Sequence, residues 1–283
     1  MGFAKVVGVY VIKGKKPALV DCGYASSYEN VLAGLSEIGL SPSDIRYVVP
    51  THVHLDHAGA AGHLMRTMPN AEMLAQERGI PHLADPTRLM ESATKVFGRA
   101  ITELYGAPVP VPSERITAVG EEMHLDLGDN FGATLIHAPG HAPHQLCVLL
   151  ENAGMLLTAD AVGVVYPALN TLIPATPPPS FNPEVLIHTI GRLEQTTPDK
   201  LLVPHFGARD DVLSMFEETR TKVLQWVRET RDLKNRGLGL DEIGEVMEKK
   251  VKNEAAVGDL PIYARVFVRT SLMGILHYLE KNP

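Results

Sequence analysis

The sequence predicts an α+β fold, with both strands and helices in the first 209 residues and helices alone from residue 210 onward. Two short β-branched runs, residues 5–12 and 17–21, surround a Lys-Gly-Lys-Lys turn, and alternating apolar segments separated by turn residues fill residues 116–158. From residue 210 onward the apolar residues recur at helical spacing instead. Runs of strands followed by a run of helices are typical of the α+β class.

Between the first hairpin and residue 158, hydrophobic spacing and turn residues define the expected elements. They are a helix over 28–38, a buried strand over 45–49, a helix over 58–68, a strand over 71–75 and a mainly helical stretch over 76–105 with breaks near Pro81 and Pro86. A proline-rich loop at residues 107–113 follows. We expect the strands of residues 116–158 to form a second sheet.

Residues 163–183 contain six prolines and little periodicity, which predicts a long loop of the kind that is often functional or mobile. After it we expect a helix over 184–194, a last strand over 200–203, and helices over 210–234, 241–252 and 261–281. The change in composition near residue 210 divides the chain into a first domain, residues 1–209, and a helical appendage, residues 210–283. We expect the appendage to serve as a lid or as a contact in a homodimer.

The bulk composition is that of a soluble globular protein, with 45% hydrophobic residues and a formal net charge of -7. The chain lacks the dense Lys/Arg block that nucleic-acid binding requires, and no apolar segment approaches the ~20 residues that span a bilayer. Cys22 and Cys147 lie in apolar runs without C-x-x-C spacing, so we expect buried thiols. We therefore predict a cytoplasmic protein whose partner is a small-molecule substrate, with neither nucleic acid nor membrane involved.

Residues 51–57 are the most informative segment, because they place three histidines and one aspartate directly after the apolar run 45–49. Histidine and carboxylate side chains are the usual ligands of zinc, iron and manganese. The alternating spacing lets His52 and His54 point the same way, while the Asp56-His57 pair faces a neighbouring position. The segment is expected to supply ligands to two adjacent metal positions.

Three further polar residues stand where apolar strands are expected to end: His141, Asp160 and His205. A glycine or proline lies beside both histidines, so a strand delivers a metal-ligand type to the mouth of a loop with a fixed turn. The repeated context makes these residues candidate ligands of the same metal site.

Together these residues resemble those of the metallo-β-lactamase-fold hydrolases. The family's HxHxDH motif is present in full at residues 52–57, and its later motifs match His141, Asp160 and His205 in the family's chain order. Asp21-Cys22-Gly23 is similar to the family's Asp-Thr-Gly, with cysteine in place of threonine. The resemblance covers residues 5–207 and implies a four-layer αββα sandwich with the metal site at the edge between the two sheets.

The resemblance also implies a role for each candidate ligand. The first metal would be held by His52, His54 and His141, the second by Asp56, His57 and His205, with Asp160 bridging the two. Two divalent ions, zinc foremost with iron or manganese as alternatives, can acidify a shared water and clamp the attacking and leaving oxygens. Asp56 is in addition expected to act in catalysis, by orienting the nucleophile or accepting its proton. The implied activity is hydrolysis of a small ester-like substrate, a thioester or a lactone.

Three other functions are weighed against the hydrolase by their ligands. A mononuclear iron dioxygenase similar to the persulfide dioxygenases of this fold would bind iron through His52, His141 and Asp160. A purely structural metal site is disfavoured, because structural zinc sites are usually closed and rich in cysteine. Flavodiiron-type proteins have HxExDH, and His54 occupies the position of that glutamate. The substrate, the physiological metal and the oligomeric state are left open by the sequence.

Several other side chains are further candidates for the site. Asp21 either orients a metal ligand or caps its turn, and His144 is either ordinary or in contact with a ligand or the substrate. Tyr166 and Phe206 could line a substrate pocket, with apolar packing as the default. Five further histidines are expected to be ordinary surface or core residues: His63, His82, His124, His188 and His277.

Overall fold

The computed structural model describes residues 6–205 and 207–282, and these form two compact units. The first unit comprises residues 7–137 and 144–159, and the second comprises Val6, residues 138–143 and the chain from residue 160 onward. The division between residues 209 and 210 that composition suggested stays a prediction. Among the described residues, no helix has both the length and the apolar surface that a membrane crossing needs.

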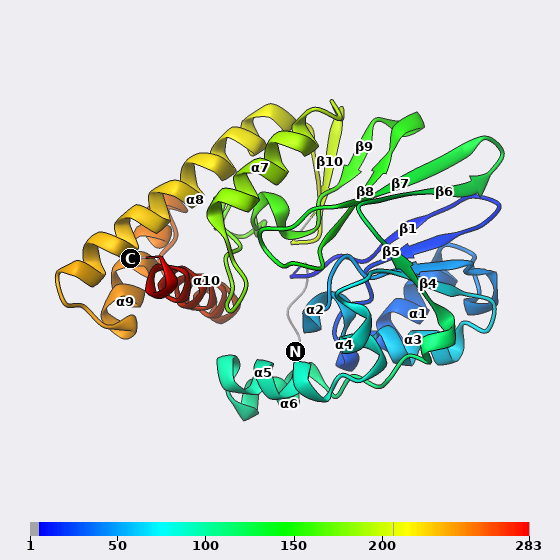
Figure 1. Ribbon diagram of the computed structural model, residues 1–283, viewed down its shortest axis with the longest axis horizontal. Coiled ribbons are helices and arrows are strands. Elements are labelled where there is room, and N and C mark those ends of the chain that lie inside the picture. The colour runs from blue at the N-terminus through cyan, green and yellow to red at the C-terminus, as the bar shows by residue number, and fades with distance from the viewer. Residues whose placement is uncertain (1–5, 206, 283) are drawn as a thin grey trace. The chain divides into compact units, whose positions relative to one another are not determined.

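The first sheet of the first unit is formed mainly by parallel strands joined through helices. In spatial order it contains β1 (Tyr10–Ile12), β2 (Ala18–Val20), β3 (Tyr47–Val49), β4 (Glu72–Gln76) and β5 (Ile116–Val119), and only β1 and β2 pair antiparallel among these described strands. Parallel neighbours need a crossover. Accordingly, α1 (Tyr28–Glu37) connects β2 to β3, and α2 (Leu55–Ala58) with α3 (Ala61–Thr67) connects β3 to β4. Figure 1 shows α1 and α3 lying along this sheet.

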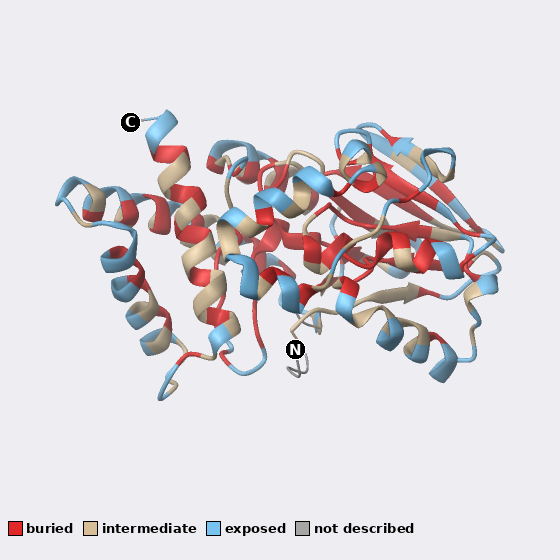
Figure 2. Cartoon of the chain, turned by 90° about the horizontal axis from the view of Figure 1, so that it is seen from below, coloured by how far each residue is buried: buried red, intermediate tan, exposed pale blue. Residues whose placement is uncertain are grey.

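The core of the first unit lies between this sheet and its helices. Leu35 of α1 and Leu64 of α3 pack in one cluster with Leu19, Val48 and Met73 from three neighbouring strands, and all five side chains are buried. Each such burial stabilises the fold by about 1.5–3 kcal/mol. Figure 2 shows the buried residues concentrated along the strands. The periodicity of residues 28–38 and 58–68 therefore identified the helix faces that cover the sheet.

One sheet assignment made from the sequence is wrong. The strand expected at the start of residues 116–158 is β5, and it pairs with β4 of the first sheet through Met73 and Ile116. Periodicity predicts a strand but not its partner, which depends on tertiary packing. The helical stretch before it is confirmed as α4 (Ile80–Ala84), α5 (Thr87–Phe97) and α6 (Arg99–Tyr105). The expected break near Pro86 separates α4 from α5, whereas Pro81 lies in the first turn of α4 and Gly98, with φ 79°, separates α5 from α6.

The second sheet contains the other strands of the first unit as an antiparallel meander. They are β6 (Glu122–Gly128), β7 (Phe131–His137), β8 (Leu146–Leu150) and β9 (Met155–Leu157). Asp129 and Asn130 connect β6 to β7 with φ of 56° and 58°, the left-handed conformation that tight hairpins require. One of the turns expected between the strands of residues 116–158 is thus confirmed.

The second unit is mainly helical. It contains α7 (Pro183–Glu194), the antiparallel pair β10 (Lys200–Val203) and β11 (Gly207–Arg209), and then α8 (Val212–Asn235), α9 (Leu240–Glu254) and α10 (Ile262–Lys281), which Figure 1 shows as the yellow to red end of the chain. The helical tail is confirmed, whereas β11 was not predicted. The expected long loop extends from residue 163 to the start of α7 at Pro183. Within it, Val164 and Ile173 form an isolated antiparallel bridge.

A buried tyrosine connects two helices of the second unit and gives stability a pH dependence. Tyr278 of α10 donates a hydrogen bond of 2.5 Å to Glu184 Oε1 of α7. Burial, together with this hydrogen bond, raises the pKa of Tyr278 to about 12. An unfolded tyrosine ionises near pH 10, so the contribution to stability is complete below about pH 10 and is lost as the pH rises toward about 12.

We expect Tyr278→Phe to reduce the loss of stability between pH 9 and 12, because the variant has no phenol that ionises preferentially on unfolding. Thermal midpoints of the wild type and the variant, measured across this range, should converge as the pH rises. Parallel curves would contradict this assignment. Tyr47→Phe, in β3 of the first unit, provides a control for the loss of a hydroxyl group elsewhere.

Candidate metal centre

The carboxylate of Asp21 organises the loop that contains the HxHxDH motif. Asp21 follows β2, and its backbone N–H donates to Val49 O, so the ends of the parallel strands β2 and β3 meet at one edge. Asp21 Oδ1 accepts hydrogen bonds from Thr51 N at 2.8 Å and Thr51 Oγ1 at 2.7 Å, and Oδ2 lies 2.9 Å from His57 Nδ1. Because a carboxylate accepts, His57 Nδ1 carries the proton and Nε2 presents its lone pair.

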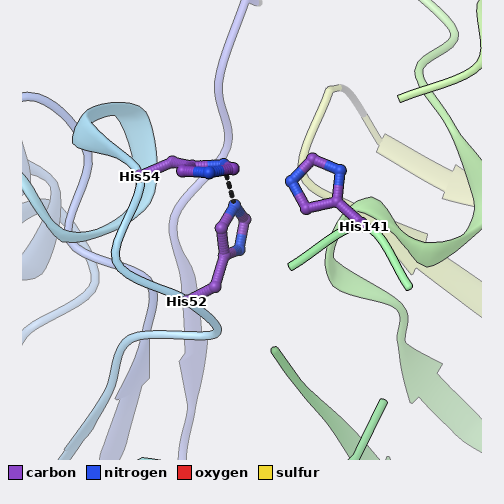
Figure 3. Close-up of side chains that lie close together, drawn as sticks. All are labelled: His52, His54 and His141. Atoms are coloured by element: carbon purple, nitrogen blue, oxygen red, sulfur yellow. Dashed lines mark hydrogen bonds between the residues drawn. The ribbon is translucent and has the colours of Figure 1, made fainter. Parts of the chain in front are cut away.

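His52 and His54 follow Thr51 in the chain, and their rings face each other. His52 Nε2 is 2.9 Å from His54 Nδ1, and the two rings meet edge to face with centroids 4.5 Å apart. The His54 carbonyl accepts from the N–H groups of His57 and Ala58, which starts α2 and sets the direction of the chain after the motif. Figure 3 draws both rings together with His141. Two ring nitrogens that approach this closely can share a proton or offer their lone pairs to a cation.

His141 of the second unit is held in a tight loop after β7. Gly140 has φ 129°, and a Cβ there would lie 2.4 Å from Leu186 Cα in α7, so only glycine fits. His141 Nδ1 donates to Ala175 O at 2.9 Å. The ring is therefore fixed in the tautomer whose Nε2 accepts, in the same way as His57.

Asp160 lies between His141 and His205 within the second unit. Its Oδ2 is 3.5 Å from His141 Nε2, and its Oδ1 is 3.5 Å from His205 Nε2. His205 Nδ1 donates to Val6 O at 2.8 Å, so both Nε2 atoms are lone-pair donors that face carboxylate oxygens. Two ligands at 2.0–2.2 Å from one tetrahedral ion lie about 3.4 Å apart. The spacing thus fits two cations, one on each side of the carboxylate.

The seven ligands expected from the sequence are divided between the two units. His52, His54, Asp56 and His57 lie in the first unit, and His141, Asp160 and His205 lie in the second. Their assignment to two metal ions stays a prediction. The donor set is nitrogen and oxygen without sulfur, which fits zinc, iron and manganese. Asp56 Oδ2 lies 3.6 Å from His57 Nε2. Asp56 and His54 are half-buried, whereas the other five expected ligands are buried.

Two residues at this site have left-handed backbone conformations without being glycine. Asp21 has φ 63° and Ala159, directly before Asp160, has φ 46°. Such conformations cost of order 1–3 kcal/mol and persist where the surrounding structure imposes them, commonly at functional sites. Both place a carboxylate at the end of a strand, where the histidines lie.

The remaining candidates can now be placed. His144 Nδ1 lies 3.5 Å from Val53 N, and its ring lies 6.4 Å from that of His52 and 6.1 Å from that of His54. Of its two expected roles, proximity to the ligands is the one the structure supports. The ring of Tyr166 lies 6.0 Å from that of His205, and Phe206 is outside the described residues.

The other histidines with described contacts and the two cysteines have different surroundings. His63 stacks on Tyr28 and lies near Ala107 O, away from the motif. His82, expected to be ordinary, has its ring 6.2 Å from that of His144. Cys22 and Cys147 are free and buried, and burial raises the pKa of the Cys22 thiol well above its usual range.

Sequence reasoning missed the groups that support the ligands. Thr51 Oγ1 lies 3.2 Å from His52 Nδ1 and also binds Asp21, and its place between β3 and the motif was the one available signal. The carbonyls of Val6 and Ala175 had no signal, because every residue offers a carbonyl and only the folded chain selects one. Phe267 of α10, whose ring lies 5.9 Å from that of His205, was equally hidden within a helical pattern.

Fold and site together define a metal-binding protein built on two sheets with a helical C-terminal tail. The family model of the metallo-beta-lactamase superfamily matches residues 4–217. The chain belongs to the metallo-β-lactamase superfamily. The predicted fold class, the four-layer αββα sandwich with C-terminal helices, is confirmed.

Curated relatives include both hydrolases and oxidoreductases. The chain is 29% identical over 180 residues to the metallo-beta-lactamase fold-containing protein ST1585 of Sulfurisphaera tokodaii, covering 62% of this chain and 64% of the relative. It is 32% identical over 136 residues to the N-acyl homoserine lactonase AttM of Azorhizobium caulinodans, covering 47% of each. With the flavo-diiron protein FprA2 of Clostridium acetobutylicum it shares 26% over 155 residues, covering 54% of this chain and 33% of that one. The matched regions thus span less than two thirds of these relatives.

Solved structures agree on the fold. The metallo-beta-lactamase family protein TTHA1429 from Thermus thermophilus superposes with a TM-score of 0.72 at 18% identity, covering 100% of this chain and 91% of that one. The structure of ST1585 gives a TM-score of 0.70 at 22% identity, covering 98% of this chain and 94% of that one. The similarity extends over the helical tail as well as the sheets.

We expect Asp21→Asn to weaken metal binding by about 10–100-fold, because the amide no longer holds the proton on His57 Nδ1 as a carboxylate does. Chelator competition with zinc would measure the affinity. Asp129→Asn is a matched control, since Asp129 is also left-handed, at φ 56°, but lies in an exposed hairpin. Equal affinities in the two variants would count against the role of Asp21.

Proposed function

We propose that the protein is a dinuclear metal-dependent hydrolase that cleaves a small ester-like substrate, a lactone or a thioester. The observation that supports this most is the geometry of Asp160, whose two oxygens face the Nε2 atoms of two different histidines at 3.5 Å. A carboxylate placed in this way is suited to bridge two ions. When bound, a pair of divalent ions supplies the Lewis acidity that acidifies water and polarises a carbonyl group.

The chain's own residues would divide the remaining work. His52, His54 and His141 would hold one ion, and Asp56, His57 and His205 the other. Hydrogen bonds from Nδ1 to Asp21, Ala175 O and Val6 O fix the orientation of three of these imidazoles and the nitrogen that faces the site, so no reorganisation is needed when substrate binds.

Asp56 is the proposed catalytic residue. It is partly exposed and lies beside His57, so its carboxylate can reach a substrate that approaches from solvent. A carboxylate in this place can orient water or accept its proton, in addition to binding a metal ion. Neither role requires a serine or cysteine nucleophile.

The choice of substrate rests on a relative. AttM is named an N-acyl homoserine lactonase, and the chain matches it over 136 residues at 32% identity, which favours a lactone. We further propose zinc as the physiological metal, a small molecule as the only partner besides a second copy of the chain, and a cytoplasmic location, which suits two buried free thiols.

The alternative is an oxidoreductase. The relative FprA2, a flavo-diiron protein, shows that the superfamily also includes proteins named for iron. A mononuclear iron dioxygenase would use His52, His141 and Asp160. The metal content separates the two proposals.

We expect protein purified without chelator, from medium that contains zinc, iron and manganese, to contain two zinc ions per chain and to hydrolyse lactones or thioesters. Elemental analysis followed by a screen of both substrate classes tests this. A single iron per chain, with oxygen consumption on glutathione persulfide, would replace the hydrolase with the dioxygenase.

We expect Asp56→Asn to lower kcat by about 10²–10⁴-fold, the usual contribution of a general acid–base group. The metal content of the variant, measured in parallel, separates loss of the proton acceptor from loss of a ligand. Asp85→Asn, an exposed aspartate of the same unit, serves as the control. Full turnover in Asp56→Asn with both metals retained would remove Asp56 from the mechanism.

A further inference from the structure

The orientation of His141 depends on a segment that has no regular secondary structure of its own. His141 Nδ1 donates to the carbonyl of Ala175, which lies in the proline-rich loop before α7. A backbone carbonyl can fix an imidazole only if the backbone itself is fixed. The question is therefore what holds residues 174–176 in place.

Helix α10 holds this segment on both sides of Ala175. Ser271 Oγ donates to Pro174 O at 2.8 Å, and Thr176 Oγ1 donates to Ser271 O at 2.9 Å. A longer contact of 3.5 Å joins Thr176 N to Ser271 Oγ. Ser271, Ala175 and Thr176 are all buried, so water does not compete for these hydrogen bonds. A single serine thus positions the residue before and the residue after the carbonyl that His141 uses.

Gly274 lets the loop lie directly against the helix. A Cβ at this position would lie 1.9 Å from Thr176 O and 2.5 Å from Pro177 C, closer than any non-bonded contact allows. Because the obstacle is backbone rather than a flexible side chain, the loop would have to move. Within α10, Gly274 is therefore required by the path of residues 176–177 and not by the helix.

The same face of α10 also reaches the other histidine beside Asp160. Tyr263, Phe267, Ser271 and Gly274 are spaced by four, four and three residues, which places them on one face of the helix. The ring of Phe267 lies 5.9 Å from that of His205 and 6.1 Å from that of Tyr166, and Tyr263 contacts Tyr166 at 4.8 Å. One helical face thus contacts His205 directly and supports His141 through the loop.

We propose that this face of α10 is a positioning element of the metal centre, in which Ser271 and Gly274 are positioning residues for His141. The inference rests on the proposed metal site. It gives the C-terminal helices a role besides that of a lid or a dimer contact, since without α10 the Ala175 carbonyl would have no fixed place. Metal affinity should then depend on residues that contact no ligand atom.

Two variants and two matched controls test this. Ser271→Ala removes the hydroxyl that holds Pro174 and Thr176, and Gly274→Ala displaces the loop. The controls are Thr270→Ala, whose hydroxyl bonds only to Val266 O of the same helix among its described contacts, and Gly191→Ala in α7, where an added Cβ meets nothing within 4 Å. We expect the two variants to bind cobalt(II) or zinc about 10–100-fold more weakly than the wild type, and the controls to bind normally.

A spectroscopic readout separates positioning from general stability. At saturating cobalt(II), the visible d–d absorption of the variants should differ from that of the wild type, because His141 is no longer held in the same orientation. A purely structural role would lower the unfolding midpoint of the metal-free protein and leave the saturated spectrum unchanged, and that result would overturn the inference. Wild-type metal affinity in Ser271→Ala would also overturn the inference. This variant decides the question if Gly274→Ala does not fold.

The failure of this inference is distinguishable from failure of the proposed function. If the wild type itself binds neither metal, the metal centre is wrong and α10 has nothing to position. If the wild type binds two ions and both variants match it in affinity and spectrum, the metal centre stands and the role of α10 is wrong.

Discussion

The buried carboxylate of Asp21 is the interaction on which the rest of the site depends. It is 2% exposed, and an unpaired charge in such a place would cost several kcal/mol. Thr51 supplies two donors and His57 a third, so the carboxylate is satisfied only when the loop after β3 has one particular shape. That shape fixes where the motif begins and which tautomer His57 adopts. The left-handed backbone at Asp21 is the conformational cost of placing the carboxylate there.

The same solution recurs at the other ligands with different acceptors. His141 and His205 each donate Nδ1 to a backbone carbonyl, of Ala175 and Val6 respectively, where His57 uses a carboxylate. A carbonyl carries no net charge, so it fixes the tautomer without adding to the negative charge of Asp160 nearby. The second unit thus orients its histidines by the path of its backbone, and the first unit does so by a charged side chain. Substitution of Asp21 therefore changes the hydrogen bond to His57 itself, whereas the acceptor of His141 can be displaced only by moving the backbone that carries it.

This difference explains what the sequence could and could not reveal. Ligand residues are visible because residues 52–57 have a spacing that chance seldom produces and because His141, Asp160 and His205 each follow an apolar run. The helices of residues 28–38 and 210–281 were visible through their apolar periodicity. The sheet to which β5 belongs could not be predicted, because the pattern that starts at Ile116 predicts a strand in the first sheet as well as in the second. Nor could any pattern select Ala175 or Gly274, whose roles lie in a backbone atom and in an absent side chain.

The ligand set by itself does not separate hydrolysis from redox chemistry. Imidazole and carboxylate groups bind zinc and iron alike, and the relatives of this chain include a lactonase and a flavo-diiron protein. What distinguishes such proteins must therefore lie around the ligands, in features that alter access, charge and rigidity. In this chain those features are the partly exposed carboxylate of Asp56, the aromatic rings of Tyr166 and Phe267 in contact with His205, and the rigid carbonyl at Ala175. A partly exposed carboxylate beside rigidly held imidazoles suits proton transfer to and from water, which hydrolysis needs at every turnover.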